Sequence, residues 1–126
     1  MSNHRKLLVS HRANALSIAV HRVARTFKRG AAPGLKAQLL RSVESIPANI
    51  VEGAGRGTRA EFAHFVGVAI GSANETETHL MLALGLEMIA PEVGARLLDE
   101  VDQIRRMLFG LRKFLLSDPD EDSGRP

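Results

Sequence analysis

Apolar residues with helical spacing run along nearly the whole chain and constrain its fold more than any other feature. In each of four segments, an aliphatic or Phe side chain returns every three or four residues, which is the period of one face of an α-helix. Turns rich in Gly or containing Pro separate these segments. Short loops between amphipathic helices predict an all-α, up-down-up-down four-helix bundle. The expected helices cover about residues 5–29, 35–52, 58–88 and 91–115.

Three local signals refine these helices. Thr58 and Glu61 have the spacing of a capping box, which marks the start of the third helix. Pro91 suits the first turn of the fourth helix. Pro47 lies inside the second helix, where it removes one backbone donor and crowds the carbonyl of Val43. We therefore expect the second helix to be kinked at Pro47.

The composition fits one folded domain followed by a short tail. A chain of 126 residues can bury one hydrophobic core, and we assign residues 1–116 to the bundle. Residues 117–126 contain four acids and no apolar anchor, so we expect a flexible acidic C-terminal tail. The longest apolar runs have seven residues, far fewer than a membrane span needs, and no signal peptide is recognisable. A cytoplasmic protein without a membrane partner is expected.

The net charge of +3 conceals a strong asymmetry along the chain. Residues 1–43 contain nine Lys and Arg side chains and no acid, whereas all 14 acidic residues follow. Such a basic half favours RNA, DNA or another polyanion as partner. The alternatives are an ordinary solvated surface, or head-to-tail self-association of a bipolar protein. The candidate nucleic-acid-binding residues, several of which recur on the polar face of the first helix, are His11, Arg22, Arg25, Lys28, Arg29 and Lys36.

A second candidate anion contact lies in the Gly-rich turn at residues 53–57. This turn places Arg56 and Arg59 beside the start of the third helix, where free backbone amides favour anions. It lacks the preceding strand and the Lys-Ser/Thr ending of a phosphate loop. Both a phosphate contact and a plain turn are compatible with the sequence.

The sequence offers no recognisable catalytic or metal site. There is no Cys, which excludes disulfides and thiolate chemistry. Glu61 and His64 have the Glu-x-x-His spacing of di-iron bundles, but the second such motif is missing and the first helix contains no acid. No spacing suggests a nucleophile with its base. We expect no enzyme, no metal and no cofactor, and none of the five His residues shows ligand spacing: His4, His11, His21, His64 and His79.

Glu77 is the one charged residue inside a predicted core stripe, between Ala73 and Leu80. A buried carboxylate must be paired or protonated. By their level along the bundle, the cations within its reach are Arg25, Arg29 and Arg105. Two roles are open: a buried pair that fixes the register of the helices, and a catalytic or ligand-holding acid.

Apolar surface in excess of one core predicts self-association. The apolar arc of the fourth helix is wider than a single core needs, because it also includes Leu98, Met107, Phe109 and Phe114. The expected helix lengths also make the third and fourth helices overhang the others by more than two turns. An apolar overhang needs a partner. The residues of this predicted overhang are Met81, Leu82, Leu84, Leu86, Met88 and Ile89.

Three stretches carry a resemblance to a known family. They are Ser45–Arg56 (SIPANIVEGAGR), Glu61-Phe62 and Ala69–Thr78 (AIGSANETET). They resemble the four-helix-bundle proteins encoded in intervening sequences of 23S rRNA genes, a family that includes the accessory protein of diversity-generating retroelements. The residues that match the family's structural motif are Pro47, Asn49, Glu52, Gly53, Gly55, Arg56, Gly71, Ser72, Glu75 and Glu77.

This resemblance implies a cytosolic homo-oligomer, a pentameric ring of bundles. It also implies that one branch binds nucleic acid and a reverse transcriptase through basic surfaces. Ser10 and His21 stand where the family usually has aromatic residues in the first helix. Two functions therefore stay open: a nucleic-acid-binding accessory scaffold, and an oligomeric protein-interaction module without a nucleic-acid role.

Overall fold

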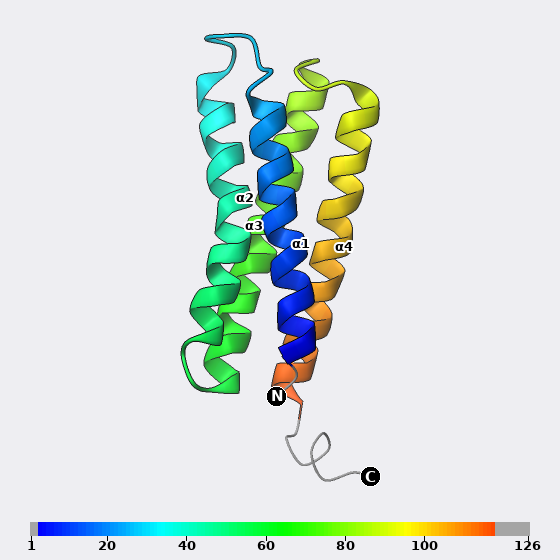
Figure 1. Ribbon diagram of the computed structural model, residues 1–126. Coiled ribbons are helices and arrows are strands. Elements are labelled where there is room, and N and C mark those ends of the chain that lie inside the picture. The colour runs from blue at the N-terminus through cyan, green and yellow to red at the C-terminus, as the bar shows by residue number, and fades with distance from the viewer. Residues whose placement is uncertain (1–2, 118–126) are drawn as a thin grey trace.

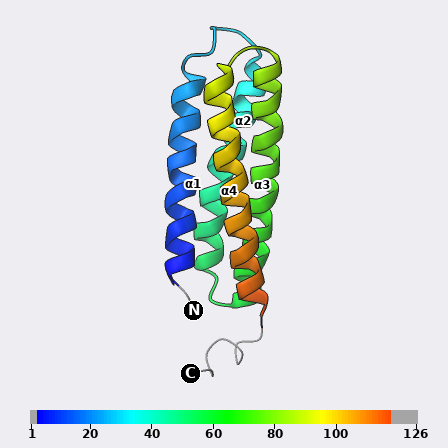
Figure 2. The same cartoon turned by 90° about the vertical axis from the view of Figure 1, so that its right-hand side faces the viewer.

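The computed structural model describes residues 3–117, and these form a bundle of four long helices (Figure 1). Helix α1 contacts α2 and α4, and α3 contacts the same two helices. The start of α1, the end of α4 and the α2–α3 turn lie at one end of the bundle, and the other two loops lie at the opposite end (Figure 2). This arrangement confirms the predicted all-α bundle. The helices are α1 (Asn3–Ala24), α2 (Pro33–Ala54), α3 (Arg59–Gly85) and α4 (Pro91–Leu116).

The core is built from the apolar stripes that the spacing predicts. On α2, for example, Val43, Ile46 and Ile50 are completely buried. All four helices contribute to one continuous cluster of apolar side chains. Burial of these stripes stabilises helices whose outer faces remain polar. The largest fully buried side chains include Leu16, Leu39, Phe62, Leu80, Ile104, Leu108 and Leu111.

Helix α1 ends five residues earlier than predicted, at Ala24 rather than near Arg29. The Thr26 hydroxyl donates to the Val23 carbonyl oxygen at 2.6 Å, and the amide of Phe27 donates to Ala24 three residues back. The Phe27 side chain is buried in the core. These contacts replace further helical hydrogen bonds, so residues 25–32 form a loop.

The predicted overhang of α3 and α4 is wrong. Helices α1 and α2 have 22 residues each, and α3 and α4 have 27 and 26. The excess is therefore four or five residues, or about 7 Å of helix. The loop after α1 extends to the same end of the bundle (Figure 1). Ile89 is buried and Leu84 and Met88 pack against the core, so only Met81, Leu82 and Leu86 of the predicted overhang are exposed.

The helix starts agree with their sequence signals. The Thr58 hydroxyl oxygen accepts a hydrogen bond from the Glu61 amide at 3.1 Å, which confirms the cap of α3. The Glu61 carboxylate accepts from the Thr58 hydroxyl at 3.0 Å rather than from its backbone amide. Pro91 begins α4. Helix α2 runs through Pro47 without interruption, and the kink at this residue stays a prediction.

Helix α4 ends at the predicted domain boundary, which stays a prediction. Leu116 is its last residue, and Ser117 caps it with a backbone hydrogen bond to Phe114. The rest of the predicted acidic tail lies outside the described residues. None of the described helices combines the length and hydrophobicity needed to cross a membrane.

Candidate nucleic-acid interface

The predicted basic residues divide between α1 and the loop after it. His11 and Arg22 are exposed on α1, and Arg25 directly follows its last turn. Lys28 and Arg29 are exposed in the loop, so Arg29 does not continue the helical stripe as expected, because the helix has already ended. Lys36 is half-buried in the first turn of α2. We call His11, Arg22, Arg25, Lys28 and Arg29 the α1 basic surface.

Arg22 and Arg25 lie together around a shallow hollow of about 440 Å³ between α1 and α2. The hollow is also lined by Ser17, Ile18, His21 and Glu44. Within residues 3–117, neither guanidinium forms an ion pair with a carboxylate. His11 lies eleven residues before Arg22, about 16 Å along the helix, and is not part of the hollow.

Glu44, the acidic residue that lines this hollow, contacts His21 of α1. His21 Nε2 lies 2.7 Å from Glu44 Oε1, and His21 Nδ1 lies 2.8 Å from the Ser17 carbonyl oxygen. Glu44 thus has a partner in His21, and within residues 3–117 it forms no ion pair with Arg22 or Arg25.

Arg56 and Arg59, the second predicted anion contact, both have partners within the protein. Arg56 pairs with Glu52 at 2.8 Å and stacks on the Phe65 ring at 4.8 Å. Arg59 donates to the carbonyl oxygens of Phe114 and Leu115 and so caps the C-terminus of α4. No local pattern announces this cap, because Arg59 and its acceptors are more than 50 residues apart.

Glu77 is not buried as predicted. Its side chain is 35% exposed and pairs at 3.0 Å with Arg105, one of the three expected cations. This hydrogen bond is the main cause of a raised pKa for Arg105, which also contacts Asp102. Thr76 takes the core position, because the stripe steps three residues from Ala73 and then four to Leu80. Glu77 therefore links α3 and α4 at the rim of the core.

Arg12 has a structural role that the sequence did not reveal. Its guanidinium donates to both Glu100 oxygens at 2.6 and 2.9 Å and to Gln103 at 2.7 Å. The hydrogen bond to Glu100 raises the pKa of Arg12. This contact ties α1 to α4, so Arg12 does not add to the α1 basic surface. Within residues 3–117, no three His, Asp or Glu side chains gather as metal ligands would.

Comparison with known proteins decides the family. The sequence profile of the 23S rRNA-intervening sequence proteins matches residues 5–110. The chain belongs to this family. Its fold is similar to a crystal structure described as a protein with unknown function from the S23 ribosomal protein family of Bacteroides thetaiotaomicron. The two share 25% identity with a TM-score of 0.81, over 86% of this chain and 98% of the other. No curated protein matches the sequence.

Two motif residues of the family, Asn49 and Ser72, take part in hydrogen bonds along the seam between α2 and α3. Asn49 donates to the Ser45 carbonyl oxygen at 2.8 Å and to its hydroxyl at 2.9 Å. Ser72 donates to the same Ser45 hydroxyl at 2.7 Å. One turn further, Thr76 Oγ1 lies 3.0 Å from Ser42 Oγ. The sequence signal for this hydrogen-bonded ladder is the recurrence of small polar residues every three or four positions on both helices.

Other motif residues have different settings. Gly53 is buried where α2 meets α3, and a Cβ there would lie 2.7 Å from the Phe65 Cβ. Gly55 and Glu75 are exposed, and a Cβ added to Gly71 would meet no atom within 4 Å. Packing of α2 against α3 therefore requires a glycine at residue 53. Within residues 3–117, no contact of this kind requires the residues found at positions 55, 71 and 75.

Apolar side chains remain exposed on each helix. Of the four that widen the predicted arc of α4, Leu98, Met107 and Phe114 pack partly against the core, and Phe109 is 53% exposed. Arg5 and Arg59 both stack on the Phe114 ring, at 5.2 and 4.7 Å. The exposed large apolar residues are Leu7, Leu8, Ile18, Val51, Val68, Met81, Leu82, Leu86, Phe109 and Leu116.

Proposed function

We propose that this family member is a non-enzymatic, homo-oligomeric scaffold that binds nucleic acid through the α1 basic surface. The observation that carries the proposal is the hollow between α1 and α2. There Arg22 and Arg25 are both exposed, and Glu44, the carboxylate that lines the hollow within residues 3–117, lies 2.7 Å from His21. Lys28 and Arg29 follow in the adjoining loop, and Lys36 lies in the first turn of α2.

The chemistry of this surface suits the phosphate backbone rather than the bases. Guanidinium groups bind phosphate oxygens with two parallel hydrogen bonds. The chain has no Trp or Tyr, and Phe27, the aromatic residue of the loop, is buried. The described part of this surface therefore exposes no Trp, Tyr or Phe ring, the side chains on which single-stranded bases most often stack. We propose sequence-independent binding of RNA or DNA whose affinity falls steeply with salt concentration.

Self-association is the second part of the proposal. Phe109 and Leu116 support it, because both are more than half exposed and line one hollow near the end of α4, and adjoining exposed apolar side chains mark interaction sites. The family resemblance suggests five subunits, a reverse transcriptase as a protein partner and a cytoplasmic location. Repetition of the α1 basic surface in a ring would amplify weak phosphate contacts through multivalency.

An oligomeric protein-interaction module is the alternative. Met81 and Leu82 are 59% and 51% exposed near the end of α3, and Leu86 follows them. This apolar group at the end of the bundle that also carries the basic loop would suit a protein partner with acidic and apolar side chains. In this alternative the α1 basic surface docks acidic side chains instead of phosphates.

Binding of a fluorescent single-stranded RNA and a duplex DNA tests the proposal. The triple variant Arg22/Arg25/Arg29→Ala should lose most affinity while its fold and oligomeric state persist, because these side chains lie outside the core. A matched control, Arg96/Arg112/Lys113→Ala, removes the same charge from exposed positions of α4. Equal losses in both variants would show a net-charge effect, and unchanged binding of the first variant would remove the α1 basic surface from the proposal.

A further inference from the structure

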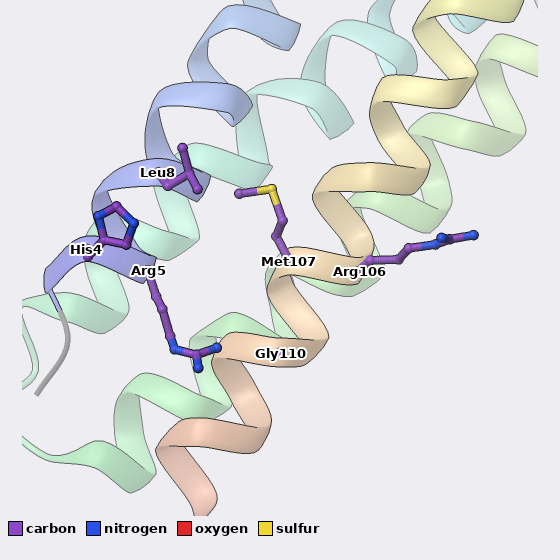
Figure 3. Close-up of a pocket in the computed structure, with 6 residues that line it drawn as sticks. All are labelled: His4, Arg5, Leu8, Arg106, Met107 and Gly110. Atoms are coloured by element: carbon purple, nitrogen blue, oxygen red, sulfur yellow. The ribbon is translucent and has the colours of Figure 1, made fainter. Parts of the chain in front are cut away.

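A groove at the other end of α1 has a chemistry different from that of the α1 basic surface. It lies between the start of α1 and the last third of α4 and has a volume of about 360 Å³ (Figure 3). Leu8 and Met107 extend toward each other across it, and Gly110 leaves space because it has no side chain. The residues that line the groove are His4, Arg5, Leu8, Arg106, Met107 and Gly110.

Arg5 supplies the positive charge that faces this groove. Its side chain reaches from α1 to α4 beside Gly110, and its Nη1 would lie 3.9 Å from a Cβ at that position (Figure 3). The Arg5 side chain is exposed, and its guanidinium lies 5.2 Å from the centroid of the Phe114 ring, a cation–π contact that favours this position. Among residues 3–117 no carboxylate pairs with Arg5. A guanidinium that already favours this position loses less conformational freedom when it binds an anion.

The second Arg of the groove is turned outward. Figure 3 shows Arg106 extending away from Leu8 and Met107. Its guanidinium is 3.1 Å from Asp102 on the same helix and is largely exposed. Of the residues that the structure describes, no acid lines the groove itself. The groove thus presents one cation beside an apolar floor, and His4 lies at its edge.

We propose that this groove is a binding site for a small amphiphilic carboxylate. Its carboxylate would form two hydrogen bonds with Arg5, and its apolar chain would lie on Leu8 and Met107. The volume is in the range of small-molecule sites, and the flexible Met side chain adapts to chains of different shape. Arg5 lies 17 residues before Arg22, about 25 Å along α1, so the site is separate from the α1 basic surface.

Titration of the full chain with octanoate, followed by backbone amide NMR shifts, tests the site. The expected shifts cluster at residues 4–8 and 106–110. Acetate, which has the charge without the chain, and octan-1-ol, which has the chain without the charge, should each bind at least about tenfold more weakly. Equal binding of octan-1-ol, or octanoate shifts spread over all exposed apolar residues, would overturn the proposal.

Variants locate the two contacts. Arg5→Gln keeps a long polar side chain above Phe114 but removes the charge, and it should weaken octanoate binding about tenfold or more. Gly110→Leu should fill the groove and abolish binding. Arg112→Ala is the matched control, because Arg112 is an exposed cation of α4 outside the groove, and it should bind octanoate normally. An Arg5→Gln variant that binds as the parent does would refute the assignment. A fall in octanoate affinity with rising protein concentration would also refute the assignment, because it would show that a second copy of the chain occupies the groove.

Discussion

Gly53→Ala probes a close approach of α2 and α3. A Cβ at residue 53 would lie 2.7 Å from the Phe65 Cβ, 2.9 Å from the Phe62 Cδ1 and 3.2 Å from the Phe62 carbonyl oxygen. Carbon atoms in favourable contact are about 3.5–4.0 Å apart. Two of the three atoms belong to the backbone or the first side-chain carbon and cannot rotate away. The two helices must therefore separate by close to 1 Å to admit one methyl group.

The change in the free energy of unfolding caused by Gly53→Ala is the difference between two opposing effects. Overpacking of a tight core costs about 1–3 kcal/mol. The higher helix propensity of Ala offsets at most about 1 kcal/mol of this, and less here because Gly53 lies in the last turn of α2. We expect a net loss of about 1–2 kcal/mol in the free energy of unfolding. For a domain of this size, the melting temperature should fall by roughly 3–10 °C.

Thermal and urea denaturation followed by circular dichroism measure this loss. Gly67→Ala is the matched control inside α3, since the nearest atom to its added Cβ is Arg112 Nε at 3.7 Å, an ordinary contact. This control should be stabilised by up to about 1 kcal/mol. If Gly53→Ala were stabilised to the same extent, the close packing of α2 on α3 would be wrong at this level of the bundle.

Three further predictions concern the ion pairs, the cap and the assembly. Arg59→Ala should cost about 1.5–3 kcal/mol because the last carbonyls of α4 lose a charged donor, and Arg59→Lys should restore only part of this in urea denaturation. Glu77→Ala should cost about 1 kcal/mol, since the carboxylate is part-exposed and Arg105 keeps Asp102; a loss of about 3–5 kcal/mol would indicate a buried pair. Light scattering at micromolar concentration should give a mass near five times the 13.7 kDa of one chain, and a clean monomer would exclude the proposed assembly.

The fold could be predicted because its signal is local. The apolar period, the Thr58 cap and Pro91 each act within a few residues, and together they located four helices in the right order. The end of α1 was missed because the Phe27 side chain turns into the core, which is a tertiary contact. Glu77 was misplaced because steps of three and four residues are equally compatible with one helical face. Thr76 occupies the buried position instead of Glu77, because its hydroxyl donates a hydrogen bond to the Ser72 carbonyl oxygen within the same helix.

The candidate site was less accessible to sequence reasoning. Which cations stay available depends on partners far away in the chain: Arg12 is bound by Glu100, and Arg59 by the end of α4. The sequence around Arg22 and Arg25 contains no pattern that distinguishes them from Arg12 and Arg59. The groove at Arg5 was not predicted either, because Leu8 and Met107 come from opposite ends of the sequence. The charge composition thus indicated a basic surface. The packing of the helices determined which of its Arg side chains have no ion-pair partner within residues 3–117.

The salt dependence of RNA affinity shows whether the α1 basic surface binds phosphates. Affinity for a single-stranded RNA should be measured between about 50 and about 200 mM KCl, with the parent and the Arg22/Arg25/Arg29→Ala variant side by side. The account predicts a linear fall of log K with log salt for the parent. The slope of the variant should be shallower by about 0.7 for each phosphate contact that is lost. Failure of the parent to bind at about 50 mM salt, or identical slopes for the two proteins, would contradict nucleic-acid binding through the α1 basic surface.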